Sequence, residues 1–363
     1  MRRRPRLIVL GALAAVALLV PAASAQSEGS PQPRIVGGSQ ASISQFPWQA
    51  AVTWSPGKVS GTARDRQFCG GSLLTSRIVI TAAHCVFDTD ADCGPVAQPP
   101  NPPFCTALFD PGGDGTSRLD PDDVDAVLGR TTLSQSDGAE IPVIGTAYRS
   151  NYDPDYQGDG VPRFDVGYLV LASASAQSTI KIADSSAQSL WAPGSPVDVS
   201  GWGSTTEFGG PVDSLRAATV NIVSDTTCNA DYAPDFDSST MVCAAAPGKD
   251  SCSGDSGGPL QAAPAGGGYL LVGITGWGDG CAQPNGPGVY TRVAGPTMAS
   301  LIQSDVSSLQ ATYGLRAEGI FGGLTATPTT KSAKHPFAKC KRIRNKKKRK
   351  RCIKKVRKKL NSV

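Results

Sequence analysis

Residues 254–259 read Gly254-Asp-Ser-Gly-Gly-Pro259, and this stretch decides both the fold and the chemistry that the sequence predicts. Its glycines let the backbone turn tightly around Ser256, so that the N–H groups of Gly254 and Ser256 can face a developing negative charge. A serine hydroxyl is a weak nucleophile at its own pKa, and Ser256 therefore needs a base that takes its proton. The rest of the chain must supply that base.

The base is expected to be a histidine, and the chain contains only two. His335 lies in a strongly basic C-terminal segment, which leaves His84, within Thr81-Ala-Ala-His-Cys85, as the imidazole of the body. A lone histidine is more often structural than catalytic. In the catalytic role its second ring nitrogen would donate a hydrogen bond to a carboxylate, for which Asp165 is the candidate. Three aspartates of the preceding loop are its rivals: Asp153, Asp155 and Asp159.

Four segments, in their order along the chain, together resemble the chymotrypsin/trypsin family of serine proteases. They are Arg34-Ile-Val-Gly-Gly38, Thr81-Ala-Ala-His-Cys85, Asp165-Val-Gly-Tyr-Leu169 and Gly254-Asp-Ser-Gly-Gly-Pro259. The resemblance covers residues 35 to about 313. It implies an all-β fold of two six-stranded antiparallel β-barrels, with the active site in the cleft between them and a C-terminal helix. The implied enzyme is an endopeptidase that forms an acyl-enzyme and needs no cofactor or metal.

The resemblance assigns a role to each residue of these motifs. His84, Asp165 and Ser256 correspond to the catalytic triad, and Asp165 is preferred because the apolar run 166–171 follows it directly. The N–H groups of Gly254 and Ser256 correspond to the oxyanion hole. Residue 276 departs from the pattern, because Gly276 stands where a serine normally helps to hold the triad aspartate.

Activation by proteolysis is also implied. Cleavage after Arg34 would release the α-ammonium group of Ile35, which would insert and pair with Asp255 beside the nucleophile. That buried ion pair would order the oxyanion loop. Because Arg34 matches the specificity expected of the enzyme, one enzyme molecule could activate another.

Substrate preference is predicted from the position six residues before Ser256. Asp250 stands where trypsin-like members of the family carry a carboxylate at the base of the S1 pocket. Gly278, next to Trp277, and Gly288 leave the pocket walls open for a long side chain. An unpaired buried carboxylate is costly, so the pocket is expected to bind Arg or Lys at P1.

The ten cysteines, an even number, favour an exported protein with disulfides. The resemblance implies three pairs: Cys69 with Cys85, Cys228 with Cys243, and Cys252 with Cys281. Two further pairs are proposed from proximity in the sequence alone: Cys93 with Cys105, and Cys340 with Cys352. The first of these would close an Asp/Pro/Gly-rich surface loop inserted between Phe87 and Asp125.

The N-terminus has the pattern of a signal peptide. Four arginines precede the apolar run 7–20, and small residues follow at 23–25. The run is shorter than the roughly 20 residues that a membrane span needs. We therefore predict a secreted, extracellular protein without a membrane span in its mature form. The predicted parts are a signal peptide (1–25), a pro-segment (26–34), a protease domain (35–314), a flexible linker (315–330) and a basic tail (331–363).

Composition supports a β-rich body. Only 18% of the residues are charged, and there are 41 glycines and 28 prolines, which favours short strands and turns over amphipathic helices. Short apolar runs predict strands at 72–82, 124–129, 166–171, 197–201, 218–223, 269–275 and 288–293. A closing helix is expected over 294–313. We expect a monomer.

The net charge of +5 conceals two oppositely charged parts. The tail, residues 331–363, contains 17 Lys or Arg and no acid, whereas residues 35–330 contain 13 basic and 29 acidic residues. Such a tail is either a solvated, disordered segment or a segment that binds an anionic polymer. In the second case its affinity for the polymer should fall steeply as the salt concentration rises. Base-specific recognition is not expected, because Phe337 is the tail's only aromatic residue.

Two alternatives of another class remain. A pseudoprotease would keep the fold as a binding module, but its usual sign, a replaced triad or S1 residue, is missing. In the other alternative the basic tail is the main functional part and the body only carries it. Labelling by a reagent that phosphonylates active-site serines separates both from an active enzyme.

Overall fold

The computed structural model describes residues 35–87, 118–149, 151–156, 161–207 and 209–324. The predicted signal peptide, the pro-segment and the basic tail lie outside these residues. So do Cys93, Cys105, Cys340 and Cys352, with the two disulfides proposed for them.

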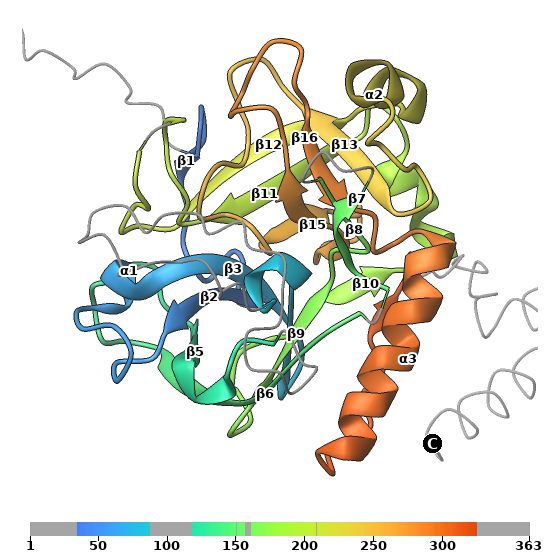
Figure 1. Cartoon of the computed structure of the whole chain (residues 1–363). Helices are drawn as coiled ribbons and strands as arrows, with labels where there is room; N and C mark the ends of the chain where they lie inside the picture. Colours follow the sequence, from blue (N-terminus) through green and yellow to red (C-terminus); the bar gives the residue numbers. More distant parts are fainter. Residues whose placement is uncertain (1–34, 88–117, 150, 157–160, 208, 325–363) are drawn as a thin grey trace, which may run out of the picture. The chain divides into compact units, whose positions relative to one another are not determined.

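The first half of the described chain forms a closed antiparallel barrel, with strand order β2-β3-β4-β9-β6-β5 (Figure 1). Its strands are β2 (Gln49–Trp54), β3 (Gln67–Thr75), β4 (Ile78–Thr81), β5 (Val124–Leu128), β6 (Ala139–Tyr148) and β9 (Gly167–Leu171). The run 72–82, predicted as one strand, is divided between β3 and β4, because the chain turns at Ser76 and Arg77.

The second half forms another antiparallel barrel, with strand order β14-β11-β12-β13-β16-β15, which closes because β14 also pairs with β15. Its strands are β11 (Pro196–Gly201), β12 (Arg216–Ile222), β13 (Met241–Ala245), β14 (Pro259–Ala262), β15 (Leu270–Trp277) and β16 (Gly288–Thr291). The prediction of two six-stranded antiparallel barrels is confirmed.

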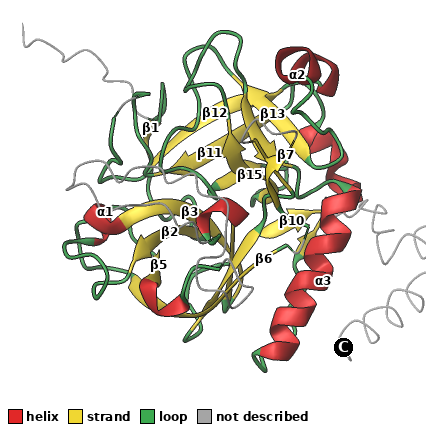
Figure 2. Ribbon diagram, viewed as in Figure 1, coloured by secondary structure: helices red, strands yellow, loops and turns green. Residues whose placement is uncertain are grey.

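Shorter elements connect and extend the barrels (Figure 2). Strand β1 (Ser39–Gln40) pairs with β12, and β7 (Asp153–Tyr156) pairs with β8 (Val161–Arg163). Strand β10 (Lys181–Ala183) pairs in parallel with β15. The short helices are α1 (Ala63–Arg66), α2 (Asp225–Tyr232), η1 (Ala83–Cys85), η2 (Pro121–Asp123) and η3 (Ser185–Trp191).

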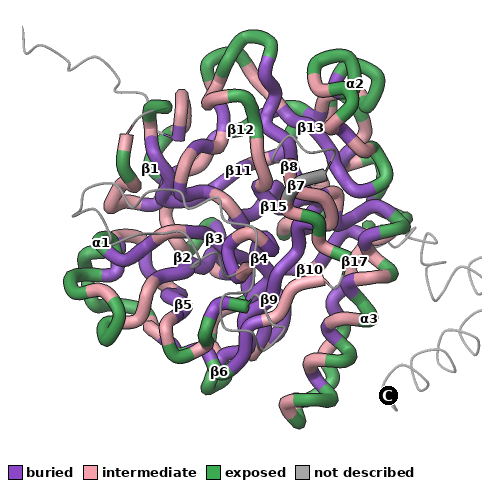
Figure 3. Tube along the Cα trace, viewed as in Figure 1, coloured by how far each residue is buried: buried purple, intermediate pink, exposed green. Residues whose placement is uncertain are grey.

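Each barrel is filled by the apolar side chains that its strands turn inward. Leu73, Ile80 and Leu169 are completely buried in the first barrel, and Leu260 and Tyr290 are completely buried in the second. Figure 3 shows this as continuous buried stretches along the strands, with exposed residues concentrated in the connecting loops. Burial on this scale supplies the main driving force for folding.

The closing helix α3 spans Pro296–Thr312, close to the predicted 294–313. Its buried residues recur every four positions, at Met298, Ile302, Val306 and Gln310, as expected for one face of a helix. Asp305 fixes the helix to the first barrel, since it pairs with Arg149 and accepts a hydrogen bond of 2.8 Å from the Tyr168 hydroxyl. Within the described ranges, no helix has both the length and the apolar character that crossing a bilayer requires.

Residues 315–324 differ from the flexible linker that their composition predicts. Strand β17 (Phe321–Gly322) pairs in parallel with β10, and Ile320 is completely buried. Glu318 accepts hydrogen bonds from the backbone N–H and the hydroxyl of Ser76 in the first barrel. The segment is ordered because β10 offers it an open strand edge, which the local sequence cannot reveal. Residues 325–330 of the predicted linker lie outside the described residues.

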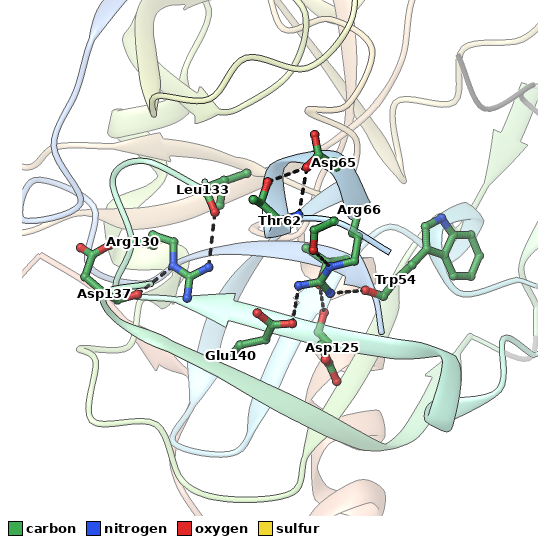
Figure 4. A network of polar contacts seen from close by, with 11 residues as sticks. Trp54, Thr62, Asp65, Arg66, Asp125, Arg130, Leu133, Asp137 and Glu140 are labelled. Atoms are coloured by element: carbon green, nitrogen blue, oxygen red, sulfur yellow. Dashed lines mark hydrogen bonds and ion pairs between the residues drawn. The ribbon is translucent and has the colours of Figure 1, made fainter. Parts of the chain in front are cut away.

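Buried arginines hold the loops of the first barrel (Figure 4). The Arg66 side chain is 3% exposed, donates to the carbonyl oxygens of Trp54 and Gly61, and pairs with Glu140 at 2.6 Å. Arg130 donates to the Asp137 carbonyl at 2.7 Å. Each guanidinium offers several fixed donors, so one side chain can satisfy several carbonyls of an irregular loop.

Candidate active site

His84 and Asp165 are brought together by two neighbouring strands of the first barrel. His84 follows β4 and Asp165 precedes β9, and these antiparallel strands pair Thr81 with Gly167 at this end. Asp165 Oδ2 lies 2.8 Å from His84 Nδ1, and Asp165 Oδ1 accepts a 2.9 Å hydrogen bond from the His84 backbone N–H. Asp165 is thus the candidate that contacts His84, while its rival Asp159 lies outside the described residues.

The environment of this pair raises the pKa of His84. Burial of the imidazole lowers its pKa, but the charge of Asp165 and the hydrogen bond to it raise the pKa by more. Asp165 itself is only 3% exposed, and its backbone carbonyl accepts a 2.9 Å hydrogen bond from Thr291 in β16. A strand of the second barrel therefore helps to fix a residue of the first.

The loop that carries Ser256 packs directly against β3 and β4. The backbone N–H of Gly70 donates to the Ser256 carbonyl at 2.7 Å, and the Cys85 sulfur lies 3.7 Å from the same oxygen. Gly257 has φ of +80°, and a Cβ at that position would lie 2.1 Å from Thr81 Oγ1. Only glycine fits there, so the tight packing brings Ser256 to the strand end that carries His84.

The hydroxyl of Ser256 is not joined to the His84 ring by any hydrogen bond of the described residues. Catalytic hydrogen bonds are often long in ligand-free enzymes and shorten when substrate binds. The structure thus brings His84 and Asp165 into direct contact and Ser256 into their neighbourhood.

Asp255 is a buried carboxylate directly before the nucleophile. It is 2% exposed and accepts hydrogen bonds from the backbone N–H groups of Gly203 at 2.8 Å and Cys252 at 3.0 Å. Burial raises its pKa to about 7, although the two backbone donors oppose that shift. The ion pairs of the described residues do not include Asp255, so its charge lacks a cation there.

The segment that begins at Ile35 enters the second barrel's core. Ile35 is completely buried among its apolar residues, and the Val36 carbonyl accepts a 3.1 Å hydrogen bond from the backbone N–H of Asp250. A Cβ on Gly37, which has φ of +70°, would lie 2.0 Å from the Gly248 carbonyl oxygen. Residues 35–37 are thus packed tightly against the loop that leads to Asp250.

Asp250, which is predicted to form the base of an S1 pocket, is buried, with an exposed fraction of 3%. Its Oδ2 accepts a 3.0 Å hydrogen bond from the backbone N–H of Ala282, while its Oδ1 has no hydrogen-bond partner among the described residues. Burial raises its pKa to about 6, against the lowering effect of the backbone N–H groups of Ala282 and Ser251. A Cβ on Gly288 would lie 2.7 Å from Asp250 Oδ1, so a larger residue at position 288 would collide with that oxygen.

The other predicted pocket residues lie at the end of β15. The Trp277 ring packs edge to face on Tyr232, with ring centroids 4.8 Å apart, and Gly278 follows it. A Cβ on Gly276 would lie 3.7 Å from Asp165 Oδ2. Residue 276 therefore lies beside Asp165, close enough for the hydroxyl of a serine to reach its carboxylate, and Gly276 has no such hydroxyl.

Three disulfides brace the site, and they are the three that the resemblance implies: Cys69–Cys85, Cys228–Cys243 and Cys252–Cys281. The first ties β3 to the residue after His84, and the last ties the loop before Ser256 to the segment between β15 and β16. His84, Cys69 and Cys85 lie close enough to suggest a metal site. Because the two sulfurs are bonded to each other, this group offers no thiolate for a metal.

One residue of the site was not predicted from the sequence. Gln67, at the start of β3, donates from Nε2 to the Gly254 carbonyl at 2.7 Å. Its position two residues before Cys69 gives no chemical signal, because a glutamine in a strand carries no catalytic pattern of its own.

Comparison with known proteins agrees with this geometry. A family model described as Trypsin matches residues 35–97 and 116–302. The chain is 33% identical over 261 residues to Trypsin from Saccharopolyspora erythraea, covering 71% of this chain and 93% of that protein. It is 34% identical over 265 residues to Trypsin-1 from Astacus astacus, covering 72% and 95%. Trypsin beta from Drosophila erecta is also 34% identical over 265 residues, covering 72% and 85%.

Proposed function

Because the chain belongs to the trypsin family of serine proteases, we propose that it is an endopeptidase that hydrolyses peptide bonds after Arg or Lys. His84, Asp165 and Ser256 form its catalytic triad in this proposal. The observation that carries the chemistry is the pair of hydrogen bonds between His84 and Asp165, with the Ser256 loop packed against the same strands. The buried carboxylate of Asp250 carries the specificity.

In the proposed reaction, Ser256 Oγ attacks the scissile carbonyl carbon while His84 takes the hydroxyl proton. The N–H groups of Gly254 and Ser256 stabilise the oxyanion of the tetrahedral intermediate. His84 then gives the proton to the leaving amine as the C–N bond breaks, which leaves an acyl-enzyme. Water attacks this ester with His84 as base, and the proton returns to Ser256 when the acid product leaves. Asp165 holds the imidazole in the tautomer that these proton transfers require.

The proposed specificity follows from the buried, unpaired charge of the Asp250 carboxylate. Its Oδ1 lacks a hydrogen-bond partner in the described structure, and its pKa of about 6 reflects the cost of an unpaired buried charge. A guanidinium or ammonium group at P1 would neutralise that charge and favour its ionised form. An apolar P1 side chain would leave the carboxylate of Asp250 buried and unpaired.

Replacing Asp250 with serine is expected to lower kcat/KM for an Arg substrate. The expected loss of transition-state stabilisation is about 3 to 5 kcal/mol, as in the breaking of a buried ion pair. Hydrolysis of a matched substrate with an apolar P1 residue should fall far less. Asp231→Ser, which removes an exposed aspartate of α2, is the control and should leave both rates unchanged. Equal losses for the two substrates in Asp250→Ser would show that Asp250 does not define S1.

Activation by cleavage after Arg34 is part of the proposal. Asp255 is buried without a cation in the described structure, and the new α-ammonium of Ile35 would supply one. Ile35 is buried with φ of +30°, a conformation that is unfavourable for a β-branched residue. Cleavage of the preceding peptide bond would release that backbone and let the terminus approach Asp255.

N-terminal sequencing of active enzyme is therefore expected to begin at Ile35. In Arg34→Gln the bond no longer matches the proposed specificity, so this variant should keep its pro-segment and gain no activity on incubation with the active enzyme. The wild-type precursor, incubated in the same way, is the control. Full activity in a chain that still begins at residue 26 would contradict the activation mechanism.

Secretion and the basic tail remain proposals. The three disulfides fit an oxidising compartment, and the pattern of residues 1–25 supports export. Residues 331–363, outside the described structure, are proposed to bind an anionic polymer. Heparin chromatography of Ser256→Ala protein, with and without the tail, tests this, because elution at the same salt concentration would leave only the solvated-tail interpretation.

A further inference from the structure

The loop that carries Ser256 packs against the first residues of β3. Gly70 donates its N–H to the Ser256 carbonyl at 2.7 Å, and a Cβ on Gly70 would lie 3.1 Å from the Gly258 Cα. These backbone contacts hold the part of the loop after Ser256. The part before it, around Gly254, is held from β3 by a side chain.

That side chain is Gln67, which is 5% exposed. Its Nε2 donates to the Gly254 carbonyl at 2.7 Å and to the Cys69 carbonyl at 3.1 Å. Both partners are acceptors, so the orientation of the amide is fixed by its contacts. Its Oε1 is buried and has no partner among the described residues. A buried acceptor without a partner lowers the stability of the fold. The hydrogen bond from Gln67 to Gly254 is therefore kept at the expense of an unsatisfied Oε1.

Gly254 needs such a hold more than its neighbours do. It has φ of +93° and no side chain, so its backbone is free to rotate unless its peptide groups are fixed by contacts. Its carbonyl, which accepts from Gln67, belongs to the peptide unit between Gly254 and Asp255. This planar unit lies between the two peptide units that carry the N–H groups of Gly254 and Ser256, so fixing it limits how far both N–H groups can turn. A donor must lie within about 2.7–3.1 Å of the oxyanion to stabilise it.

We propose that Gln67 is a positioning residue of the oxyanion hole: its amide fixes the peptide unit between Gly254 and Asp255, and thereby holds the N–H groups of Gly254 and Ser256, on either side of that unit, toward the tetrahedral intermediate. This inference rests on the proposed function, in which those two N–H groups are the oxyanion donors. In this role Gln67 acts through the backbone around Gly254 and not by contact with substrate. Its effect is therefore confined to states in which the oxyanion exists.

The test compares a probe that forms an oxyanion-like adduct with probes that do not. In Gln67→Met, which has similar length and no donor, kcat/KM is expected to fall about 10- to 100-fold, because loss of a whole oxyanion donor costs 10²–10³. Affinity for a peptide aldehyde with Arg at P1, which adds to Ser256 as a hemiacetal, should fall by a similar factor. Affinities for the corresponding peptide alcohol and for benzamidine should not change.

The control is another buried glutamine. Gln261 in β14 is completely buried, accepts from the Trp48 ring N–H and donates to the Ser200 hydroxyl, and neither partner belongs to the oxyanion hole. Gln261→Met should lower the unfolding temperature without a selective loss of aldehyde affinity. Gln67→Leu is a second donor-free variant for the case that Gln67→Met does not fold. All affinities are measured on protein with a cooperative unfolding transition.

The outcomes separate this inference from the function on which it rests. If wild-type enzyme binds the aldehyde no more tightly than the alcohol, the proposed acyl-transfer chemistry is wrong. If wild type prefers the aldehyde and the Gln67 variants keep that preference in full, only the role of Gln67 is wrong. Equal weakening of aldehyde, alcohol and benzamidine would also overturn it, because it would indicate a general structural effect.

Discussion

Replacing Ser256 with alanine is expected to lower kcat for a peptide substrate with Arg at P1 by about five to six orders of magnitude. The variant has no hydroxyl to form the acyl-enzyme, and removal of a nucleophilic serine removes most of the contribution of a triad that acts as a unit. Binding of benzamidine should be retained, because Asp250 and the pocket are untouched. The measurements are single-turnover hydrolysis and equilibrium binding of benzamidine on the same preparation.

The neighbouring serine of the same loop is the matched control. Ser253→Ala should keep activity, since in the described structure the hydrogen bond of Ser253 is made by its backbone carbonyl, which accepts from the Ser204 N–H at 2.8 Å and stays in the variant. A phosphonylating reagent should label wild type and Ser253→Ala at one site and leave Ser256→Ala unlabelled. Wild-type protein that binds benzamidine but takes no label and cleaves nothing would support the alternative of a binding module.

The candidate catalytic residues could be selected from the sequence because each has an unusual combination of type and neighbours. A single histidine in the body, a glycine-flanked serine and an aspartate before an apolar run are rare enough to be recognised without a structure. The strands that carry them were predictable from short apolar runs, and 124–129, 166–171 and 288–293 differ little from β5, β9 and β16.

Features that depend on contacts between distant segments were not predictable. Gln67 meets Gly254 across 187 positions of sequence, and neither residue's local pattern indicates the other. The order of residues 315–324 depends on an open edge at β10, far earlier in the chain. The carbonyl of Asp165 is fixed by Thr291 of the second barrel, which only the packing of the barrels reveals.

Replacing Asp165 with asparagine is expected to lower kcat at neutral pH by about 10⁴-fold. The amide oxygen can still accept from the His84 backbone N–H, so the ring should keep its place. The amide nitrogen, however, would face His84 Nδ1 as a donor. The neutral ring would then carry its proton on Nε2, and could not take the proton of Ser256.

The pH dependence gives this prediction a second readout. His84 must be neutral to act as base, so activity is lost as pH falls through the pKa of His84. In wild type the charge and hydrogen bond of Asp165 outweigh burial and hold that pKa above its ordinary value of 6.5. Asparagine removes both raising effects and leaves the lowering effect of burial. The acid limb of kcat/KM should therefore move to lower pH in Asp165→Asn, even though the maximal rate is much smaller.

A rival aspartate supplies the control for this prediction. Asp153 lies in β7, in the loop region before Asp165, and was a candidate for the same role on sequence grounds. Asp153→Asn should keep kcat close to wild type and leave the acid limb where it is. The measurement is kcat/KM for one Arg substrate from pH 4 to pH 9 in all three proteins. An acid limb that moves in Asp153→Asn, or stays fixed in Asp165→Asn, would show that the charge that sets the basicity of His84 is not that of Asp165.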